Sequence, residues 1–297
     1  MMTPRAFYHM VGKRNFLQYI FFAAFLFFFY VPLMNLCMLA FADKYEVPAI
    51  IPQKFGFKWW EFVLDQNSLM GSITTSFALA IVVTAVSMLI CIPAAYALAR
   101  YNFRGKRIFL LSFLLSNAYP RMGLYISIGI LFYKLNLMGT FLGVVIIHVV
   151  NSLMFMTWIP SGSFKSVYRQ QEESARDAGA GPLRTFFSIT LPLAMPGIAV
   201  GGVFTFLGSL EEAQGTLLVG FPEVKTMPVE LYGVIMEYPL TAGPVLSLIL
   251  IIPTILILLA MKKYLSADTI SKGYGMKKGA SYGRKSKTSD QKHEKAL

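Results

Sequence analysis

The chain has 297 residues, of which 56% are hydrophobic and only 14% are charged, and its mean hydropathy is +0.57. Soluble domains carry about 25% charged residues, and this composition also excludes disordered, collagen-like, coiled-coil and small disulfide-rich chains. The formal net charge is nevertheless +12. An apolar chain with this basic excess is typical of a membrane protein with basic loops on one side, whereas a nucleic-acid-binding protein has no need of so much apolar surface.

Six stretches are long and apolar enough to cross a hydrocarbon core about 30 Å thick, which needs roughly 20 helical residues. They predict an all-α, polytopic membrane protein with six transmembrane helices at about Phe16–Phe41, Ser72–Ala99, Ile108–Leu135, Thr140–Ile159, Gly197–Val219 and Thr241–Tyr264. The third stretch holds Pro120 and Arg121 near its middle, so we expect a broken span there, with two re-entrant hairpins as the alternative.

These spans divide the chain into three parts. Residues 1–15 form an N-terminal segment, residues 16–265 form the transmembrane domain, and residues 266–297 form a basic tail that we expect to be disordered. The first apolar run is longer than the apolar region of a signal peptide, which has roughly 7–15 residues, so we expect it to be a retained helix.

Basic residues distinguish the two sides of the membrane. Of the 27 Lys and Arg residues, 21 lie in the N-terminal segment, in the loops after the second and fourth spans, and in the C-terminal part from Lys262 on. Five lie in the three opposite loops. Because cytoplasmic loops collect Lys and Arg, this distribution predicts a multi-pass protein with both termini in the cytoplasm.

The loop after the fourth span has the composition of a folded element. Helix-forming residues dominate from Lys165 to Ala178, and Gly179 then predicts a sharp turn before an apolar patch that includes Leu183 and Phe186. Pro192 marks the return to the membrane. An amphipathic segment on the lipid headgroups would explain the apolar residues but not the turn, so the pattern favours a docking element for a cytosolic partner.

Three ionisable residues, Arg121, Glu211 and Glu212, lie at membrane depth, where charges face a cavity or pair internally. Adjacent helical positions point about 100° apart, so we expect the two glutamates to face different targets. Either one faces the solute path while the other pairs with Arg121 or a neighbouring subunit, or all three form an internal structural network. The candidate path residues, with nearby polar side chains, are Arg121, Asn117, Tyr119, Glu211, Glu212 and Gln214.

No pattern in the sequence points to catalysis. The phosphate-binding sequence GxxxxGK[ST] is missing, and Cys37 and Cys91 have no metal-ligand spacing. His148, next to Asn151 and Ser152, is interpreted as a packing histidine rather than as part of an intramembrane hydrolase. We therefore expect no catalytic residues, no metal and no cofactor in this chain.

The loop after the fourth span resembles the EAA motif, EAA-x3-G-x9-I-x-LP, of binding-protein-dependent ABC importer permeases. Glu173-Ser174-Ala175 is followed by Gly179 and by Ile189-x-Leu191-Pro192 at the matching spacing, with Ser174 in place of the second alanine as the single departure. Residues Ala94–Gly105 also resemble the end of the second span and the basic loop after it in these permeases. The resemblance covers roughly residues 15–275.

The resemblance implies the type I importer permease fold, in which a cytoplasmic coupling helix lies within the EAA loop, here residues 165–192. It implies a bacterial inner-membrane subunit that forms half of the solute path without being an enzyme itself. Its partners would be the lipid bilayer, a second permease subunit (identical or not), an extracytoplasmic solute-binding protein and two cytosolic ATP-binding subunits that hold ATP and Mg, with no nucleic acid. The implied coupling residues are Glu173, Ser174, Ala175, Arg176, Gly179, Leu183 and Phe186.

The sequence indicates the class of solute less clearly than it indicates the family. The carboxylates at membrane depth favour an organic cation, and residues 55–60 and 226–232 resemble external segments of polyamine-type permeases. Residues 95–105 and the basic, glycine-containing tail are shared with carbohydrate permeases, which are the alternative. An ion-coupled secondary transporter that uses Glu211 and Glu212 is a third possibility, although the sequence has no internal repeat to support it.

Overall fold

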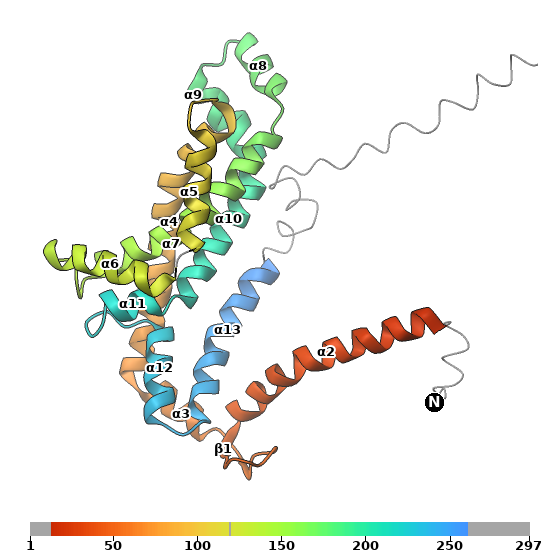
Figure 1. The fold of residues 1–297 in the computed structure, drawn as a ribbon, viewed down its shortest axis with the longest axis vertical. Coiled ribbons are helices and arrows are strands. Elements are labelled where there is room, and N and C mark those ends of the chain that lie inside the picture. The colour runs from red at the N-terminus through yellow and green to blue at the C-terminus, as the bar shows by residue number, and fades with distance from the viewer. Residues whose placement is uncertain (1–12, 119, 261–297) are drawn as a thin grey trace, which may run out of the picture. The chain divides into compact units, whose positions relative to one another are not determined.

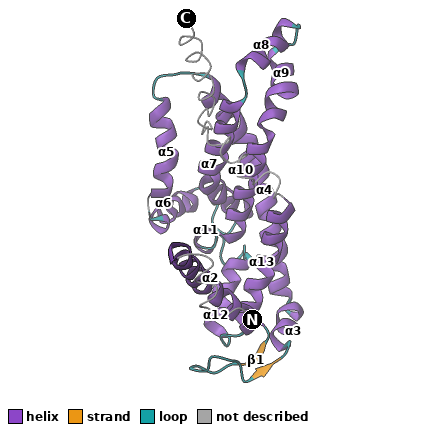
Figure 2. Cartoon of the chain, turned by 90° about the vertical axis from the view of Figure 1, so that its right-hand side faces the viewer, coloured by secondary structure: helices purple, strands orange, loops and turns teal. Residues whose placement is uncertain are grey.

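The computed structural model describes residues 13–118 and 120–260, and helices dominate them (Figure 2). Contacts within the chain divide it into two units. The first comprises the residues up to Thr74 together with Met227–Pro253, and the second comprises Thr75–Thr226 and the residues from Thr254 on. Of the sequence-based segments, the N-terminal one is described only from Lys13, and the tail from residue 266 lies outside the described residues.

The elements appear in Figure 1 under the labels used below. The first unit contains α2 (Lys13–Ala40), β1 (Ala42–Lys44), β2 (Lys54–Phe55), α3 (Lys58–Asp65), the start of α4 (Asn67–Arg100), α12 (Met227–Glu237) and most of α13 (Ala242–Ala260). The second unit contains the rest of α4, then α5 (Lys106–Ala118), α6 (Arg121–Lys134), α7 (Phe141–Ser166), α8 (Arg169–Asp177), α9 (Pro182–Thr185), the π-helical η1 (Phe186–Thr190), α10 (Leu191–Glu211) and α11 (Gln214–Val219).

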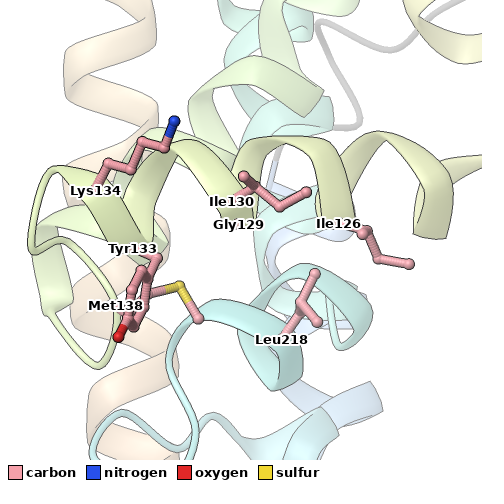
Figure 3. Close-up of a pocket in the computed structure, with 7 residues that line it drawn as sticks. All are labelled: Ile126, Gly129, Ile130, Tyr133, Lys134, Met138 and Leu218. Carbon is pink, nitrogen blue, oxygen red and sulfur yellow. The ribbon is translucent and has the colours of Figure 1, made fainter.

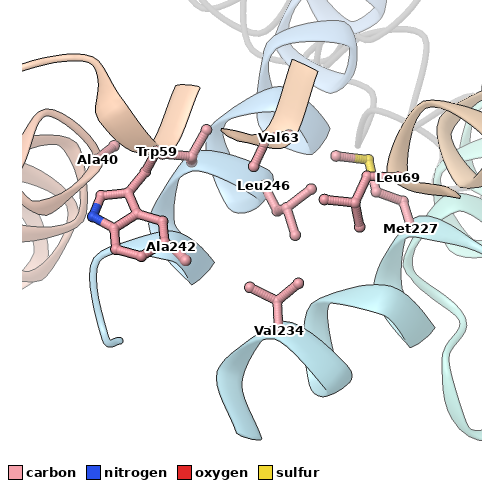
Figure 4. Packing of buried hydrophobic residues seen from close by; sticks show 9 residues of the cluster. Ala40, Trp59, Val63, Leu69, Met227, Val234, Ala242 and Leu246 are labelled. Atoms are coloured by element: carbon pink, nitrogen blue, oxygen red, sulfur yellow. The ribbon is translucent and has the colours of Figure 1, made fainter. Parts of the chain in front are cut away.

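The first unit is held together by a short hairpin and an apolar core. Strands β1 and β2 pair antiparallel with Ala42 opposite Phe55. The indole nitrogen of Trp60 donates a hydrogen bond of 2.8 Å to the carbonyl oxygen of Ala40, which ties α3 to the end of α2. Figure 4 shows the core, to which α2, α3, α4, α12 and α13 contribute residues such as Trp59 and Leu246.

In the second unit, α4, α7 and α10 pack together around one buried cluster. Its members are Cys91, Ala95, Met156, Phe164, Val167, Ala194 and Ile198. Gly197 of α10 lies directly against α7, since a Cβ atom at this position would overlap the side chain of Ser163. Small residues let membrane helices approach closely, and this contact holds α10 against α7.

Within residues 13–118 and 120–260, five helical segments are long and apolar enough to cross a membrane: α2, α4, α7, the run Pro182–Glu211, and α13. The predicted break in the third stretch is confirmed, because α5 ends at Ala118 and α6 begins at Arg121. These two helices have 13 and 14 residues, fewer than a span needs. The count of six spans therefore stays a prediction.

The predicted fifth span, Gly197–Val219, is wrong at both ends. Helical structure starts earlier and runs from Pro182 to Glu211 through two further prolines, and a break then separates α10 from α11. Pro192 closely follows the π-helical turn Phe186–Thr190, and membrane helices tolerate such internal prolines. The fourth span likewise continues through Pro160 to Ser166, because membrane helices tolerate internal prolines.

The close approach of α7 and α10 can be tested with Gly197→Ala. Because the new Cβ would overlap Ser163, we expect a loss of about 1–3 kcal/mol of unfolding free energy, seen as a lower thermal midpoint in detergent. The matched control is Gly71→Ala in α4, where an added Cβ meets nothing within 4 Å. Equal midpoints for the two variants would contradict this packing.

Candidate functional site

Two adjacent glutamates mark the end of α10. Glu211 is the last residue of the helix and is exposed, whereas Glu212 has left helical geometry, with φ −76° and ψ 111°, and is buried. The two side chains lie in different surroundings, as the sequence indicated. The cause is the end of the helix, however, and not the 100° step between helical neighbours.

The carboxylate of Glu212 accepts hydrogen bonds from three elements. Tyr125 of α6 donates its hydroxyl to Oε2 at 2.9 Å, and the amide of Asn151 in α7 donates to the same oxygen at 3.1 Å and to the Tyr125 hydroxyl at 2.6 Å. The backbone N–H of Gly215 donates to Oε1 at 2.9 Å. Because a buried carboxylate needs such partners, this network holds α6, α7 and the start of α11 together.

Arg121 adds a charge to the same cluster. Its guanidinium nitrogen Nη1 lies 3.7 Å from Oε2 of Glu212, but the Arg121 side chain is 57% exposed, so the pair stabilises the fold only weakly. The sequence left two arrangements open. The structure pairs one glutamate, Glu212, with Arg121 in an internal network, and Glu211 lies outside this network, so the three residues do not form a single network.

His148 also has structural partners. Its Nδ1 lies 2.8 Å from the hydroxyl of Ser209, and its Nε2 lies 2.8 Å from the hydroxyl of Thr216. Both ring nitrogens are therefore occupied, which is the arrangement of a packing histidine.

A small cavity of about 60 Å³ adjoins the Glu212 network, with Arg121, Asn151 and Glu212 among its lining residues. Phe155 and Phe204 stack at 5.7 Å between ring centroids in its wall, and the buried hydroxyl of Thr205 there has no hydrogen-bond partner. A cavity of this size has room for ordered water, which needs about 10–15 Å³ of such space.

The other candidate path residues are not brought into this cluster by the described structure. Gln214 is exposed at the start of α11. Tyr119 and the side chain of Asn117 lie outside the described residues.

Sequence reasoning missed Tyr125 and Asn151. The signal for Tyr125 is its position four residues after Arg121, which places both on one face of a helix.

A larger hollow of about 360 Å³ lies between α6 and α11 (Figure 3). Its lining is apolar, with Ile126, Ile130 and Leu218 as examples, and Lys134 is the one charged residue among those that line it. A polar solute needs several placed polar groups for its orientation, which this hollow does not offer.

Among the described residues, no group of three or more His, Cys, Asp or Glu side chains is placed to hold a metal ion.

The EAA-like loop forms a compact helix–turn–helix at one end of the second unit, where α8 and α9 lie (Figure 1). Gly179 has φ +87°, in the region that side chains other than glycine rarely adopt. Its N–H bonds to the carbonyl of Arg176 at 2.8 Å, and the N–H of Ala180 bonds to the carbonyl of Ala175 at 3.0 Å. These two bonds are the Schellman arrangement, which ends α8 and fixes the direction of the chain into α9.

The predicted coupling residues divide into exposed and packed ones. Glu173, Arg176 and Leu183 are exposed, and Leu183 presents 75% of its surface. The hydroxyl of Ser174 returns to the carbonyl of Gln170 at 2.8 Å, and Ala175 is half-buried.

The aromatic pair that follows behaves differently. Phe186 packs inward, with its ring 4.9 Å from that of Tyr96 and 6.2 Å from that of Phe164. Phe187 instead is exposed. The surface that the loop presents is therefore built from Glu173, Arg176, Leu183 and Phe187.

Glu172, the residue before the motif, was not singled out from the sequence. It is the one buried residue of α8, and its Oε1 receives a hydrogen bond of 2.6 Å from Nη2 of Arg100 at the end of α4. The hydroxyl of Thr190 donates to the same oxygen at 2.7 Å. The available signal is spacing, because Glu172 lies three residues before the half-buried Ala175, which places both on one face of α8.

Basic side chains gather near the same end of the unit. The Lys106 ammonium donates a hydrogen bond of 2.8 Å to the carbonyl of Tyr101, and Arg169 donates one of 3.0 Å to the carbonyl of Arg100. Burial, followed by the nearby charges of Lys165 and Arg169, lowers the pKa of Lys106. This gathering matches the basic side of the membrane that the charge distribution indicated.

Comparisons with known proteins agree on one family. The family described as binding-protein-dependent transport system inner membrane component matches residues 91–270. ORF1 of Streptomyces antibioticus, whose name describes it as an ABC transporter permease protein, is 34% identical over 167 residues, which cover 56% of this chain and 73% of that protein.

Two further relatives carry names that state a solute. The spermidine/putrescine transport system permease protein PotC of Escherichia coli is 28% identical over 183 residues, or 62% of this chain and 69% of PotC. The maltodextrin transport system permease protein MdxG of Bacillus subtilis is 28% identical over 174 residues, or 58% of this chain and 63% of MdxG. A chain of a bacterial ABC transporter involved in the import of alginate has the same fold, with a TM-score of 0.69 at 19% identity over 90% of this chain and 99% of that one.

The Glu212 network can be tested with Glu212→Gln. One carboxylate oxygen would become an NH2 group that faces either the Gly215 N–H or the donors of Tyr125 and Asn151, so we expect a loss of about 1–3 kcal/mol and a lower thermal midpoint in detergent. The matched control is Glu211→Gln, which changes an exposed carboxylate and should leave the midpoint within error. A Glu212→Gln midpoint equal to the control would show that the network contributes nothing to stability.

Proposed function

Because the chain belongs to the binding-protein-dependent transport system inner membrane components, the permeases of ABC importers, we propose that it forms half of a solute path and couples this path to ATP hydrolysis through residues 165–192. Its relatives are transport subunits, so ATP and Mg would be held by two cytosolic ATP-binding subunits and not by this chain. A second permease subunit, identical or different, would complete the path, and an extracytoplasmic binding protein would deliver the solute. Both termini would then be cytoplasmic, in line with the basic loops.

The coupling role is supported by the exposed surface of the EAA-like loop. Glu173 and Arg176 on α8 offer charges, and Leu183 and Phe187 after the turn offer apolar groups. A pair of charges beside exposed apolar side chains is a suitable docking surface for a protein groove. The positive φ of Gly179 sets the angle between the two halves of this surface.

The solute we propose is an organic cation of the polyamine type. Glu212 is occupied by its hydrogen bonds and by Arg121, so the support from the sequence now rests on Glu211, which is exposed and has no described partner. The relative PotC carries a polyamine in its name. The alternative is a carbohydrate, which is favoured by the stacked Phe155 and Phe204 beside polar groups and by the relative MdxG.

The turn at Gly179 provides a test of coupling. In the complete transporter, reconstituted in vesicles with its ATPase and binding protein, Gly179→Val should abolish most solute uptake. The reason is that a β-branched residue with positive φ costs about 1–2 kcal/mol and turns α9 away. Gly179→Asn should retain more uptake, since asparagine tolerates this region. Gly181→Ala is the control, because Gly181 has a φ of −65° and an added Cβ meets nothing within 4 Å.

The proposed ATP-driven import predicts recovery of an ATP-binding subunit when the chain is purified with the products of neighbouring genes. Uptake should survive a protonophore while ATP is maintained, whereas an ion-coupled transporter using Glu211 and Glu212 would lose it. Purification of an active transporter without any ATPase would contradict the proposal.

The solute class is tested on the binding protein and then on this chain. Thermal shifts of the cognate binding protein should be largest with polyamines among polyamines, sugars and anions. Uptake of the solute so identified should fall in Glu211→Gln and should stay unchanged in Glu61→Gln, an exposed carboxylate of α3. A shift with sugars alone would replace the polyamine proposal by the carbohydrate alternative.

A further inference from the structure

A buried ion pair joins α8 to the end of α4. Arg100 approaches Oε1 of Glu172 with two nitrogens, Nη2 at 2.6 Å and Nε at 3.1 Å. Each of the two side chains exposes only 8% of its surface. The third nitrogen of Arg100, Nη1, donates a hydrogen bond of 3.2 Å to the carbonyl oxygen of Val167. Val167 lies between α7 and α8.

The same carboxylate reaches a third helix. Thr190, which is fully buried, donates its hydroxyl to Oε1 of Glu172 at 2.7 Å. Thr190 is the last residue of η1 and directly precedes α10. One carboxylate oxygen therefore receives hydrogen bonds from the end of α4 and from the beginning of α10, while its own residue belongs to α8.

No other residue of α8 is buried, although all nine are described. A helix of nine residues is unstable in isolation, so its orientation must come from contacts with the rest of the unit. A buried ion pair adds little net stability because both charges lose water, but its geometry is specific. The effect expected of this contact is thus on the placement of α8 more than on the stability of the protein.

We propose that Glu172 is a positioning residue for coupling: through Arg100 and Thr190 it clamps α8 to the ends of α4 and α10, so that a displacement of α8 reaches both helices together. This inference rests on the proposed coupling function of the loop. It separates the roles of two adjacent glutamates, since Glu173 is exposed toward a partner while Glu172 fixes the helix that carries it.

The test uses the complete transporter in vesicles and measures ATP hydrolysed and solute imported in the same sample. In Glu172→Gln the ATPase should still assemble with the complex and hydrolyse ATP, while solute imported per ATP falls about fivefold or more, the lower range of coupling between sites. Amide hydrogen exchange should rise in Arg169–Asp177 and stay unchanged in the middle of α7. Glu61→Gln is the control for loss of an exposed carboxylate.

Variants of Thr190 and Arg100, the two residues that bond to Glu172, keep the test decisive if Glu172→Gln fails to fold. Thr190→Ser keeps the hydroxyl and should retain the import ratio, whereas Thr190→Val removes it and should lower the ratio. Arg100→Lys keeps the charge without the fork of nitrogens and should lie between wild type and Arg100→Gln. The double variant Arg100→Gln, Glu172→Gln should be no worse than the more severe single variant.

An unchanged import ratio in Glu172→Gln and Thr190→Val would overturn the clamp, and so would equal loss in Thr190→Ser and Thr190→Val. Gly179→Val separates this failure from failure of the proposed function. If Gly179→Val uncouples import and the clamp variants do not, the loop couples without the clamp. If neither affects import, the loop is not the coupling element at all.

Discussion

The carboxylate of Glu212 holds three helices at the place where α10 gives way to α11. Tyr125 brings α6 to it, Asn151 brings α7, and the N–H of Gly215 fixes the first turn of α11. The hydrocarbon core of a membrane offers no water to such groups, so a broken helix in a membrane protein must satisfy them inside the fold or beside a water-filled cavity. The break, the network and the small cavity beside them follow from this requirement.

A second glutamate pair repeats the same division at the other end of α10. Glu172 is buried and bonded while Glu173 is exposed, just as Glu212 is buried and Glu211 is exposed. In each pair the buried member bonds to neighbouring helices while the other member is exposed. The EAA spacing singles out the exposed Glu173 and not the buried Glu172.

Helix α10 links these two places. It begins next to Thr190, which bonds Glu172, and it ends at Glu211, next to the Glu212 network. Its 21 residues extend about 30 Å, and the contact of Gly197 with Ser163 holds it against α7. In the proposed importer, a displacement at the EAA-like loop would therefore travel along a packed helix to the residues beside the cavity.

Apolar length, charge and local backbone freedom can be read directly from the sequence, and they were enough to predict a membrane protein, the break at Pro120 and the glycine turn of the EAA-like loop. The predicted fifth span is misplaced because apolar residues resume at Leu217–Val219 after the polar stretch that holds Glu211, Glu212 and Gln214, whereas α10 ends at Glu211. Which glutamate of each pair is buried could not be predicted, because it depends on Arg100, Thr190, Tyr125 and Asn151, which folding brings to the glutamates from other elements. Hydrogen-bond partners across helices are selected by packing, and packing is not encoded in any short stretch of residues.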